Sequence, residues 1–169
     1  MGDAKEMAVL DEEPTGGSDV REWLSFRLGK LDYAVDILRV LEIRVWESTT
    51  RIPYSSPFVQ GLINLRGAIV PVIDLRLRLG LSAKQPDGET VILVLNVEHP
   101  QGSRTLAMIV DQIQDVIEVS GSDVRSADRF NLNINERFVY GLMDVNSNMT
   151  VLLDIDTVLD VDDSERHAS

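Results

Sequence analysis

Four aspartates are the residues of this chain whose positions could support catalysis. Asp36, Asp74, Asp111 and Asp154 each follow an apolar stretch with the pattern of a strand, where catalytic carboxylates often lie. An ungapped comparison of the two halves places Asp74 on Asp154, and the preceding segments place Asp36 on Asp111. A residue that recurs in both copies is more economically explained as the cap of a short helical turn after each strand. We therefore expect structural aspartates, and neither copy has the Asp-Thr/Ser-Gly loop of an aspartic protease.

The other nucleophiles and metal ligands lack the partners that catalysis requires. His99 lies in an expected loop and His167 near the C-terminal end, and neither has the spacing of a metal-ligand pair. The chain has no cysteine, which excludes disulfides and thiolate chemistry. There is no phosphate-binding glycine loop, and no nucleophile elbow surrounds the loop serines Ser55, Ser56, Ser120 and Ser122. We expect no enzymatic activity, no metal and no cofactor.

The segment from residue 61 to residue 74 predicts a strand, a tight turn and a second strand. Apolar residues alternate around Asn64, as in a half-buried strand, and Arg66-Gly67 then interrupts the pattern with a residue suited to positive φ. Ala68 to Ile73 is an apolar run typical of a strand that is buried on both faces. Pro71 within this run predicts an edge strand or a bulge.

A helical turn is expected directly after this hairpin. Asp74 is a suitable cap for Leu75 to Leu79, and Gly80 is a stop signal. The alternation of leucine with arginine in this turn is also compatible with a strand. We favour the helical turn because it has both a start and a stop.

The same plan recurs in residues 141–159, where Asn146-Ser147-Asn148 replaces the hairpin tip. Together with earlier strand pairs, this indicates a diverged tandem repeat with units near 23–79 and 91–159. About ten strands without a βαβ pattern predict two small barrels. Because each unit is too small to be comfortably stable alone, we expect the two to share an interface of aliphatic residues.

The net charge of −12 is concentrated at the two ends of the chain. Residues 1–20 carry six acids and one lysine, and residues 154–169 carry six acids and one arginine. This composition predicts disordered acidic tails at 1–20 and 163–169, which favour solubility; an acidic docking tail is the alternative. There is no basic cluster for nucleic acid, no apolar run of transmembrane length and no signal-peptide pattern, so we expect a cytoplasmic protein.

Three segments resemble one bacterial family. VDILRVLEIR at 35–44, PFVQGLINLRGAIVPVIDLR at 57–76 and IVDQIQDVIEV at 109–119 are similar to the CheW family of chemotaxis coupling proteins, over about residues 22–160. The same domain occurs in the kinase CheA and in CheV, but 169 residues leave no room for kinase, phosphotransfer or receiver domains. The resemblance implies an all-β fold of two packed five-stranded SH3-like β-barrels with short helical turns over residues 21–162. It also implies that the first strand crosses over to complete the distal barrel.

The resemblance further implies two partners and a binding groove between the barrels. In CheW-like proteins this groove receives the cytoplasmic tips of chemoreceptors, and the matching residues here are Glu42 and Arg66. Val40 and Val116 match groove positions as well, although each could equally be core. Ala107 stands where glycine is frequent in the family, so that its methyl group would narrow one end. The second partner is the histidine kinase CheA, for which the expected surface is the loop around Trp46, Arg51, Ile52 and Pro53, with Trp46 otherwise a core residue.

The function expected from this resemblance is that of an adaptor that couples chemoreceptors to CheA in membrane-associated arrays, without inserting into the membrane. A paralogue that serves another pathway, such as pili or gliding, would show the same motifs. A small β-barrel hydrolase or ligand-binding protein, with the aspartates around a cavity, is the alternative from a different class.

Deletion of residues 1–20 and 163–169 is expected to leave the thermal midpoint and CheA binding nearly unchanged. These ends are polar and acidic and carry few side chains that could pack. Calorimetry and a CheA binding assay on the truncated protein test this expectation. A loss of CheA affinity beyond about tenfold, or about 1.4 kcal/mol, would place an acidic end in the interface.

Overall fold

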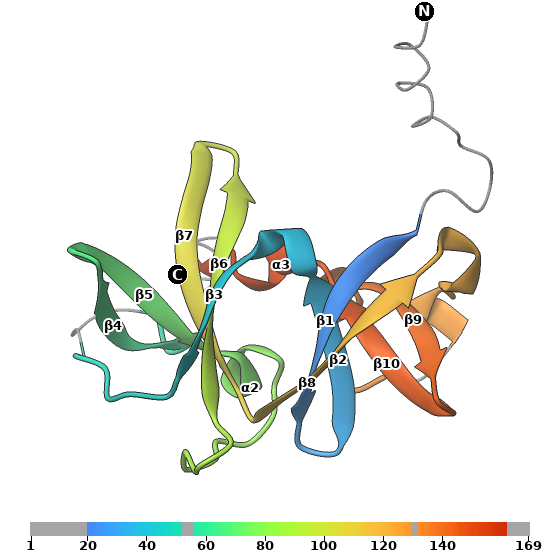
Figure 1. Ribbon diagram of the computed structural model, residues 1–169, viewed down its shortest axis with the longest axis horizontal. Helices are drawn as coiled ribbons and strands as arrows, with labels where there is room; N and C mark the ends of the chain where they lie inside the picture. The colour runs from blue at the N-terminus through green and yellow to red at the C-terminus, as the bar shows by residue number, and fades with distance from the viewer. Residues whose placement is uncertain (1–19, 52–55, 130–131, 162–169) are drawn as a thin grey trace, which may run out of the picture.

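The computed structural model describes residues 20–51, 56–129 and 132–161, which form ten strands and six short helical turns. The strands curl into two five-stranded sheets that lie side by side (Figure 1), and the all-β prediction of two five-stranded barrels is confirmed. The strands are β1 (Arg21–Leu28), β2 (Leu31–Asp36), β3 (Val40–Val45), β4 (Val59–Leu65), β5 (Ala68–Asp74), β6 (Val91–His99), β7 (Gly102–Val110), β8 (Gln112–Val119), β9 (Val139–Val145) and β10 (Asn148–Leu153). The turns are η2 (Ile37–Arg39), α2 (Leu75–Arg78), η3 (Gly121–Asp123), η4 (Ala127–Arg129), η5 (Glu136–Phe138) and α3 (Ile155–Val158).

The two barrels exchange strands in both directions. The first barrel has the order β3-β6-β7-β5-β4, and the second has the order β8-β1-β2-β10-β9. Replacing each strand by its counterpart in the other repeat converts one order into the other. The expected crossing of the first strand into the distal barrel is confirmed, and β2 accompanies β1. The reason is local: a two-residue turn at Gly29-Lys30 joins β1 and β2 as an antiparallel pair, so the hairpin moves as one unit.

The turns predicted around the hairpin of the first repeat are present. Arg66 and Gly67 have φ angles of 52° and 86°, which form the tight turn between β4 and β5. The Asp74 carboxylate accepts a hydrogen bond from the Leu77 amide at 3.3 Å, and Gly80 adopts a φ of 85° after the helical turn. The helical alternative was therefore correct for α2.

The prediction for Pro71 was only partly right. Strand β5 is not an edge strand, because it lies between β4 and β7. The parallel pairing with β7 begins only at Val72, so Pro71 lies in a part of β5 that pairs with β4 alone. A register shift in β4 between Val59 and Gly61 supplies the irregularity nearby. The first half of β5 is also not buried on both faces, since Ile69 is 60% exposed.

One glycine in each barrel leaves room for the segment that closes the barrel. An added Cβ at Gly61 would lie 2.6 Å from the Thr50 carbonyl oxygen, and one at Gly141 would overlap the Val124 side chain. At each place an incoming segment pairs with the edge strand, through Thr50 and Leu62 in the first barrel. The corresponding bridge in the second barrel joins Arg125 and Leu142. A side chain at either glycine would therefore push the closing segment away from its strand.

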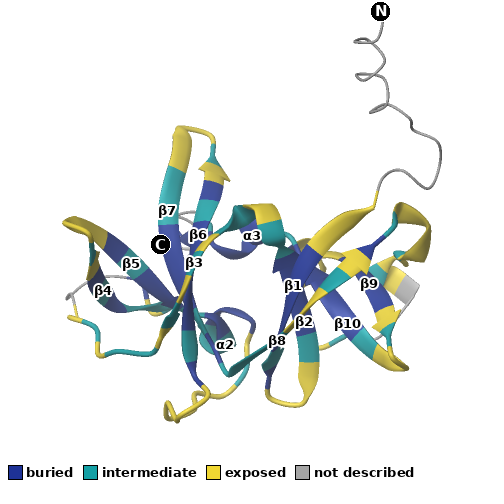
Figure 2. Ribbon diagram, viewed as in Figure 1, coloured by how far each residue is buried: buried dark blue, intermediate teal, exposed yellow. Residues whose placement is uncertain are grey.

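One large apolar cluster joins the two barrels, as the repeat analysis predicted. It draws side chains from β1 and β2 as well as from β5, β6 and β7, and it continues into β9, β10 and both short α-helices. Figure 2 shows the buried segments concentrated in the inner parts of the strands. Each barrel adds a small cluster of its own. The largest fully buried side chains are Tyr33, Phe26, Leu28, Ile73, Leu75, Ile92, Leu93, Leu95, Met108, Leu142, Leu152 and Leu159.

Ile73→Ala and Leu153→Ala are each expected to lower the free energy of unfolding by about 2–5 kcal/mol, because both side chains are buried in the shared cluster. Ile69→Ala in the same strand as Ile73 is the matched control, and its exposed side chain should cost less than about 0.5 kcal/mol. Denaturant unfolding of the three variants measures these differences. A cost for Ile73→Ala equal to that of the control would contradict its role in the core.

Candidate partner-binding surface

Glu42 and Arg66, which the sequence singles out, form an ion pair. Arg66 Nη1 lies 3.0 Å from Glu42 Oε1, and the Arg66 side chain is 75% exposed whereas that of Glu42 is 23% exposed. The Glu42 Oε1 atom is itself buried and is not aligned for a hydrogen bond. Because β3 and the β4–β5 hairpin belong to the same sheet, this pair lies within the first barrel and does not bridge the two barrels.

A second arginine extends this pair along β3. Arg44 donates a hydrogen bond of 3.2 Å to the other carboxylate oxygen of Glu42, and it also approaches Glu47 at 3.3 Å. The carboxylate of Glu42 is thus held between two guanidinium groups. Arg66 is the more exposed of the two, so it is the one available to a partner.

The outer face of β3 is apolar and exposed. Val40, Glu42 and Arg44 point inward and are half-buried, whereas the alternating residues Leu41, Ile43 and Val45 are exposed. Strand β3 is also an edge strand of the first barrel, and β8, which carries the exposed Val116, is an edge strand of the second. Figure 1 shows that β3 and β8 each begin near the middle of the molecule, and that β8 then crosses β1 and β2 and runs away from the middle.

Not every residue expected in the groove is accessible. Val116 is exposed, but Val40 packs against the shared apolar cluster. Ala107 has no exposed surface and lies in the interior cluster of the first barrel. It therefore does not line an accessible groove, because its side chain packs inside the first barrel with side chains of β4, β5 and β6.

The expected kinase surface is only partly described. Trp46 is half-buried, packs against the apolar cluster of the first barrel, and carries a buried indole Nε1 without a hydrogen-bond partner among the described residues. Trp46 is therefore not the exposed anchor that we expected, and its packing is closer to the alternative of a core residue. Arg51 is exposed, and Ile52 and Pro53 lie outside the described residues.

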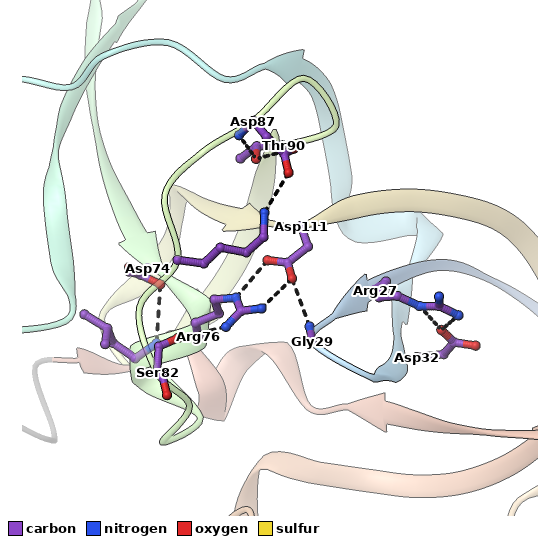
Figure 3. Close-up of polar contacts among 11 residues, drawn as sticks. Arg27, Gly29, Asp32, Asp74, Arg76, Ser82, Asp87, Thr90 and Asp111 are labelled. Atoms are coloured by element: carbon purple, nitrogen blue, oxygen red, sulfur yellow. Dashed lines mark hydrogen bonds and ion pairs between the residues drawn. The ribbon is translucent and has the colours of Figure 1, made fainter.

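Asp111 is not a helix cap, contrary to the repeat comparison, since β8 follows it after the bend. Its carboxylate instead accepts two hydrogen bonds from Arg76 of α2, at 2.9 and 2.7 Å, and one from the Gly29 amide at 2.9 Å (Figure 3). Gly29 belongs to the second barrel and α2 follows β5 of the first, so Asp111 joins the two barrels. Burial raises the pKa of Asp111, but the Arg76 and Gly29 hydrogen bonds and the charges of Arg76 and Lys84 outweigh burial and hold it below its ordinary value.

A second ion pair joins the barrels elsewhere. Arg39 of η2 donates hydrogen bonds of 2.7 and 2.6 Å to the two oxygens of Asp156 in α3, and one of 2.9 Å to the Asn96 carbonyl in β6. Asp156 also accepts a hydrogen bond from the Glu98 amide at 2.8 Å. Burial raises the pKa of Asp156, but the hydrogen bonds from Arg39 and Glu98 and the charge of Arg39 lower it below its ordinary value.

The candidate catalytic groups are occupied in structural contacts. Asp36 accepts a hydrogen bond from the Leu38 amide at 2.9 Å, and Asp154 accepts one from the Thr157 amide at 3.3 Å, as helix caps do. Within the described ranges no three His, Asp or Glu side chains are grouped as metal ligands. In the same part of the chain, no helix is long and apolar enough to cross a membrane.

The fold and the surface define a class: a domain of two strand-exchanged barrels with an exposed apolar edge and a positioned arginine. A family model for the CheW-like domain matches residues 22–163, so the chain belongs to the CheW family. It is 37% identical to the chemotaxis protein CheW of Klebsiella aerogenes, over 82% of this chain and 81% of that protein. It is 33% identical to the chemotaxis protein CheW of Rhizobium meliloti, over 86% of this chain and 91% of that protein. The crystal structure of the scaffolding protein TtCheW from Thermoanaerobacter tengcongensis matches with a TM-score of 0.74 at 26% identity, over 88% and 91% of the chains.

Sequence reasoning missed the residues that join the barrels. No sequence motif marks these residues, which are Arg39, Arg76 and Asp156. Each stands among charged or apolar residues typical of a solvated turn. The repeat comparison itself held a clue, because it aligns Arg76 of α2 with Asp156 of α3 and so marks a reversal of charge at one position.

Acid is expected to weaken the fold through Asp111 and Asp156. A carboxyl group whose pKa is lower in the folded than in the unfolded chain stabilises the fold above its unfolded pKa of about 3.9. That contribution is lost as the pH falls through the lower folded value, so unfolding curves between about pH 5 and pH 2 should show falling stability. The double variant Asp111→Asn with Asp156→Asn should be less stable at pH 7 and should lose less stability on acidification. An equally steep loss in the double variant would contradict the assignment.

Proposed function

We propose that this protein is a cytoplasmic adaptor that couples the cytoplasmic tips of chemoreceptors to the histidine kinase CheA. Membership of the CheW family supports the chemotaxis role. The observation that carries the assignment to this surface is the Arg66–Glu42 pair beside the exposed apolar face of β3.

The backbone at Arg66 supports a functional role for its side chain. Arg66 has a φ of 52°, a region that Asn and Gly adopt more readily than Arg does. The second repeat places Asn146, with a φ of 51°, at the matching tip. An ion pair with so exposed an arginine contributes little to folding, so stability does not explain an arginine at this tip. We infer that Arg66 is there to present a charge.

The chemistry of the surface fits a helical partner. Leu41, Ile43 and Val45 offer a strip of apolar side chains, and Arg66 supplies a cation at the hairpin tip of the same barrel. An amphipathic helix binds such a surface by laying its apolar face against the strip, while charged residues at the margin fix its orientation. The proposed partner is the helical hairpin at the receptor tip, and Val116 of the second barrel would contribute from the other side.

A separate surface is proposed for CheA. The segment that follows β3 leads away from the apolar strip and carries the exposed Arg51, followed by Ile52 and Pro53. Trp46 would support this segment from beneath rather than contact the kinase directly. Two separate surfaces would allow both partners to bind at once. The adaptor then transmits the receptor state only if its contacts differ between the two signalling states.

Arg66→Glu is expected to leave the thermal midpoint and CheA affinity near those of the parent protein but to lower receptor affinity by at least about tenfold. The substitution places two carboxylates together and repels acidic groups of the partner, while the backbone demand at the tip is unchanged. Titration of a receptor cytoplasmic fragment measures the affinity, and receptor-dependent activation of CheA should fall with it.

Asn146→Glu is the control, because it places a glutamate at the equivalent tip of the other barrel, with a charge change of −1 rather than −2. It should leave receptor affinity unchanged. The double variant Glu42→Arg with Arg66→Glu should repair only part of any fold defect, because Arg44 would then lie beside a like charge. It should not restore full receptor binding, since the partner reads the charges in their original positions. Receptor affinity that stays unchanged in Arg66→Glu would move the receptor surface elsewhere.

A further inference from the structure

The two edge strands β3 and β8 begin in the same manner, near the middle of the molecule. Strand β3 begins at Val40, directly after Arg39, and β8 begins at Gln112, directly after Asp111. Arg39 and Asp111 are the residues that form the ion pairs between the barrels. Each edge strand is therefore fixed at its first residue by a pair of hydrogen bonds to a short helix.

The two anchors are related by the internal repeat but have opposite polarity. Arg39 binds Asp156, the second residue of α3, whereas Asp111 binds Arg76, the second residue of α2. In each case the carboxylate also accepts a hydrogen bond from a backbone amide, that of Glu98 in the first case and that of Gly29 in the second. Figure 1 shows η2 beside α3 at one end of the interface and the link from β7 to β8 beside α2 at the other. The anchors thus hold the two barrels at two separated points.

These contacts are better suited to fixing geometry than to adding stability. A planar guanidinium bound to both oxygens of a carboxylate fixes direction as well as distance. All four side chains are only partly exposed, between 16% and 33%, so water screens the pairs less than it would a surface pair. The adjoining strands β3 and β8 are free along one edge, so no further strand fixes their spacing.

We propose that Arg39–Asp156 and Asp111–Arg76 are positioning pairs that set the spacing between the edge strands β3 and β8, and thereby the fit of a helical partner. This inference rests on the function proposed above for the site itself, but the strand spacing can be tested without a partner. Loss of either anchor allows one end of the interface to open, which moves Leu41 and its neighbours relative to Val116.

The test is a distance measurement across the two strands. The chain has no cysteine, so spin labels can be placed specifically at Leu41→Cys on β3 and Glu118→Cys on β8, both at exposed positions. Asp156→Asn and Asp111→Asn, each in this labelled background, should shift the mean label separation by about 2 Å or more, or broaden its distribution. Asp32→Asn is the matched control, because it breaks an arginine pair that lies within the β1–β2 hairpin. It should leave the separation unchanged.

Two further variants keep the test decisive. Reversing one pair, with Arg39→Asp and Asp156→Arg, should restore the separation only in part, since the Asn96 carbonyl and the Glu98 amide would lose their partners. If Asp111→Asn fails to fold, Arg76→Lys keeps the charge but loses the paired hydrogen bonds and should still broaden the distribution. In unlabelled protein, each disruptive variant should weaken receptor-fragment binding by about tenfold.

The outcomes separate this inference from the proposed function. A separation that stays unchanged in both Asn variants, with only a lower thermal midpoint, would overturn the positioning role. A changed separation with unchanged receptor affinity would support the positioning role and reject this surface as the receptor site.

Discussion

The contact between the two short α-helices depends on one buried cation. Arg78 of α2 is only 5% exposed; its Nε donates a hydrogen bond of 2.6 Å to the Val158 carbonyl, and its Nη2 approaches the carbonyls of Thr157 and Asp160 at 3.3 Å. The guanidinium also lies 5.0 Å from the ring centre of Phe58 and 4.7 Å from that of Phe138. A buried charge is tolerable only while such partners surround it. Because the carbonyls come from the end of α3, separating the two helices would remove these hydrogen bonds from a buried charge.

This requirement makes the barrels one unit rather than two neighbours. The exchange of the β1–β2 and β6–β7 hairpins already spreads each repeat over both sheets, and the shared apolar cluster gives them a common core. Arg78 of α2 then bonds to α3 through the Val158 carbonyl. Val158 is the residue that the repeat aligns with Arg78, so the two matching positions differ in chemistry. The interface is thus asymmetric in chemistry although symmetric in strand order. A rigid relation between the barrels is what a surface formed by strands from both of them needs.

The parts of the structure that the sequence predicted correctly are those that depend on neighbouring residues. The tight turn at Arg66, the cap at Asp74 and the end of α2 follow from interactions within a few positions. The errors concern contacts distant in sequence. Asp111 resembles a cap, but its partner is Arg76 on another element, and Ala107 is buried because its side chain packs with those of β4, β5 and β6. Glu42 and Arg66 were singled out through the family resemblance, whereas the residues of the anchoring ion pairs had no local signal.

The differences between the two repeats are where function can be sought, because the shared features are explained by the fold. Both barrels have the same strand order, the same capped helical turn after the hairpin and a glycine that admits the closing segment. They differ at the hairpin tip, where the first barrel holds Arg66 against a half-buried glutamate and the second has Asn146 and Ser147. An arginine in a backbone region that favours asparagine or glycine gains nothing in local energy. The exposed apolar strip of β3 lies on the same barrel, so charge and apolar surface coincide on one copy. A duplicated scaffold can in this way keep one repeat for stability while the other acquires a partner-binding surface.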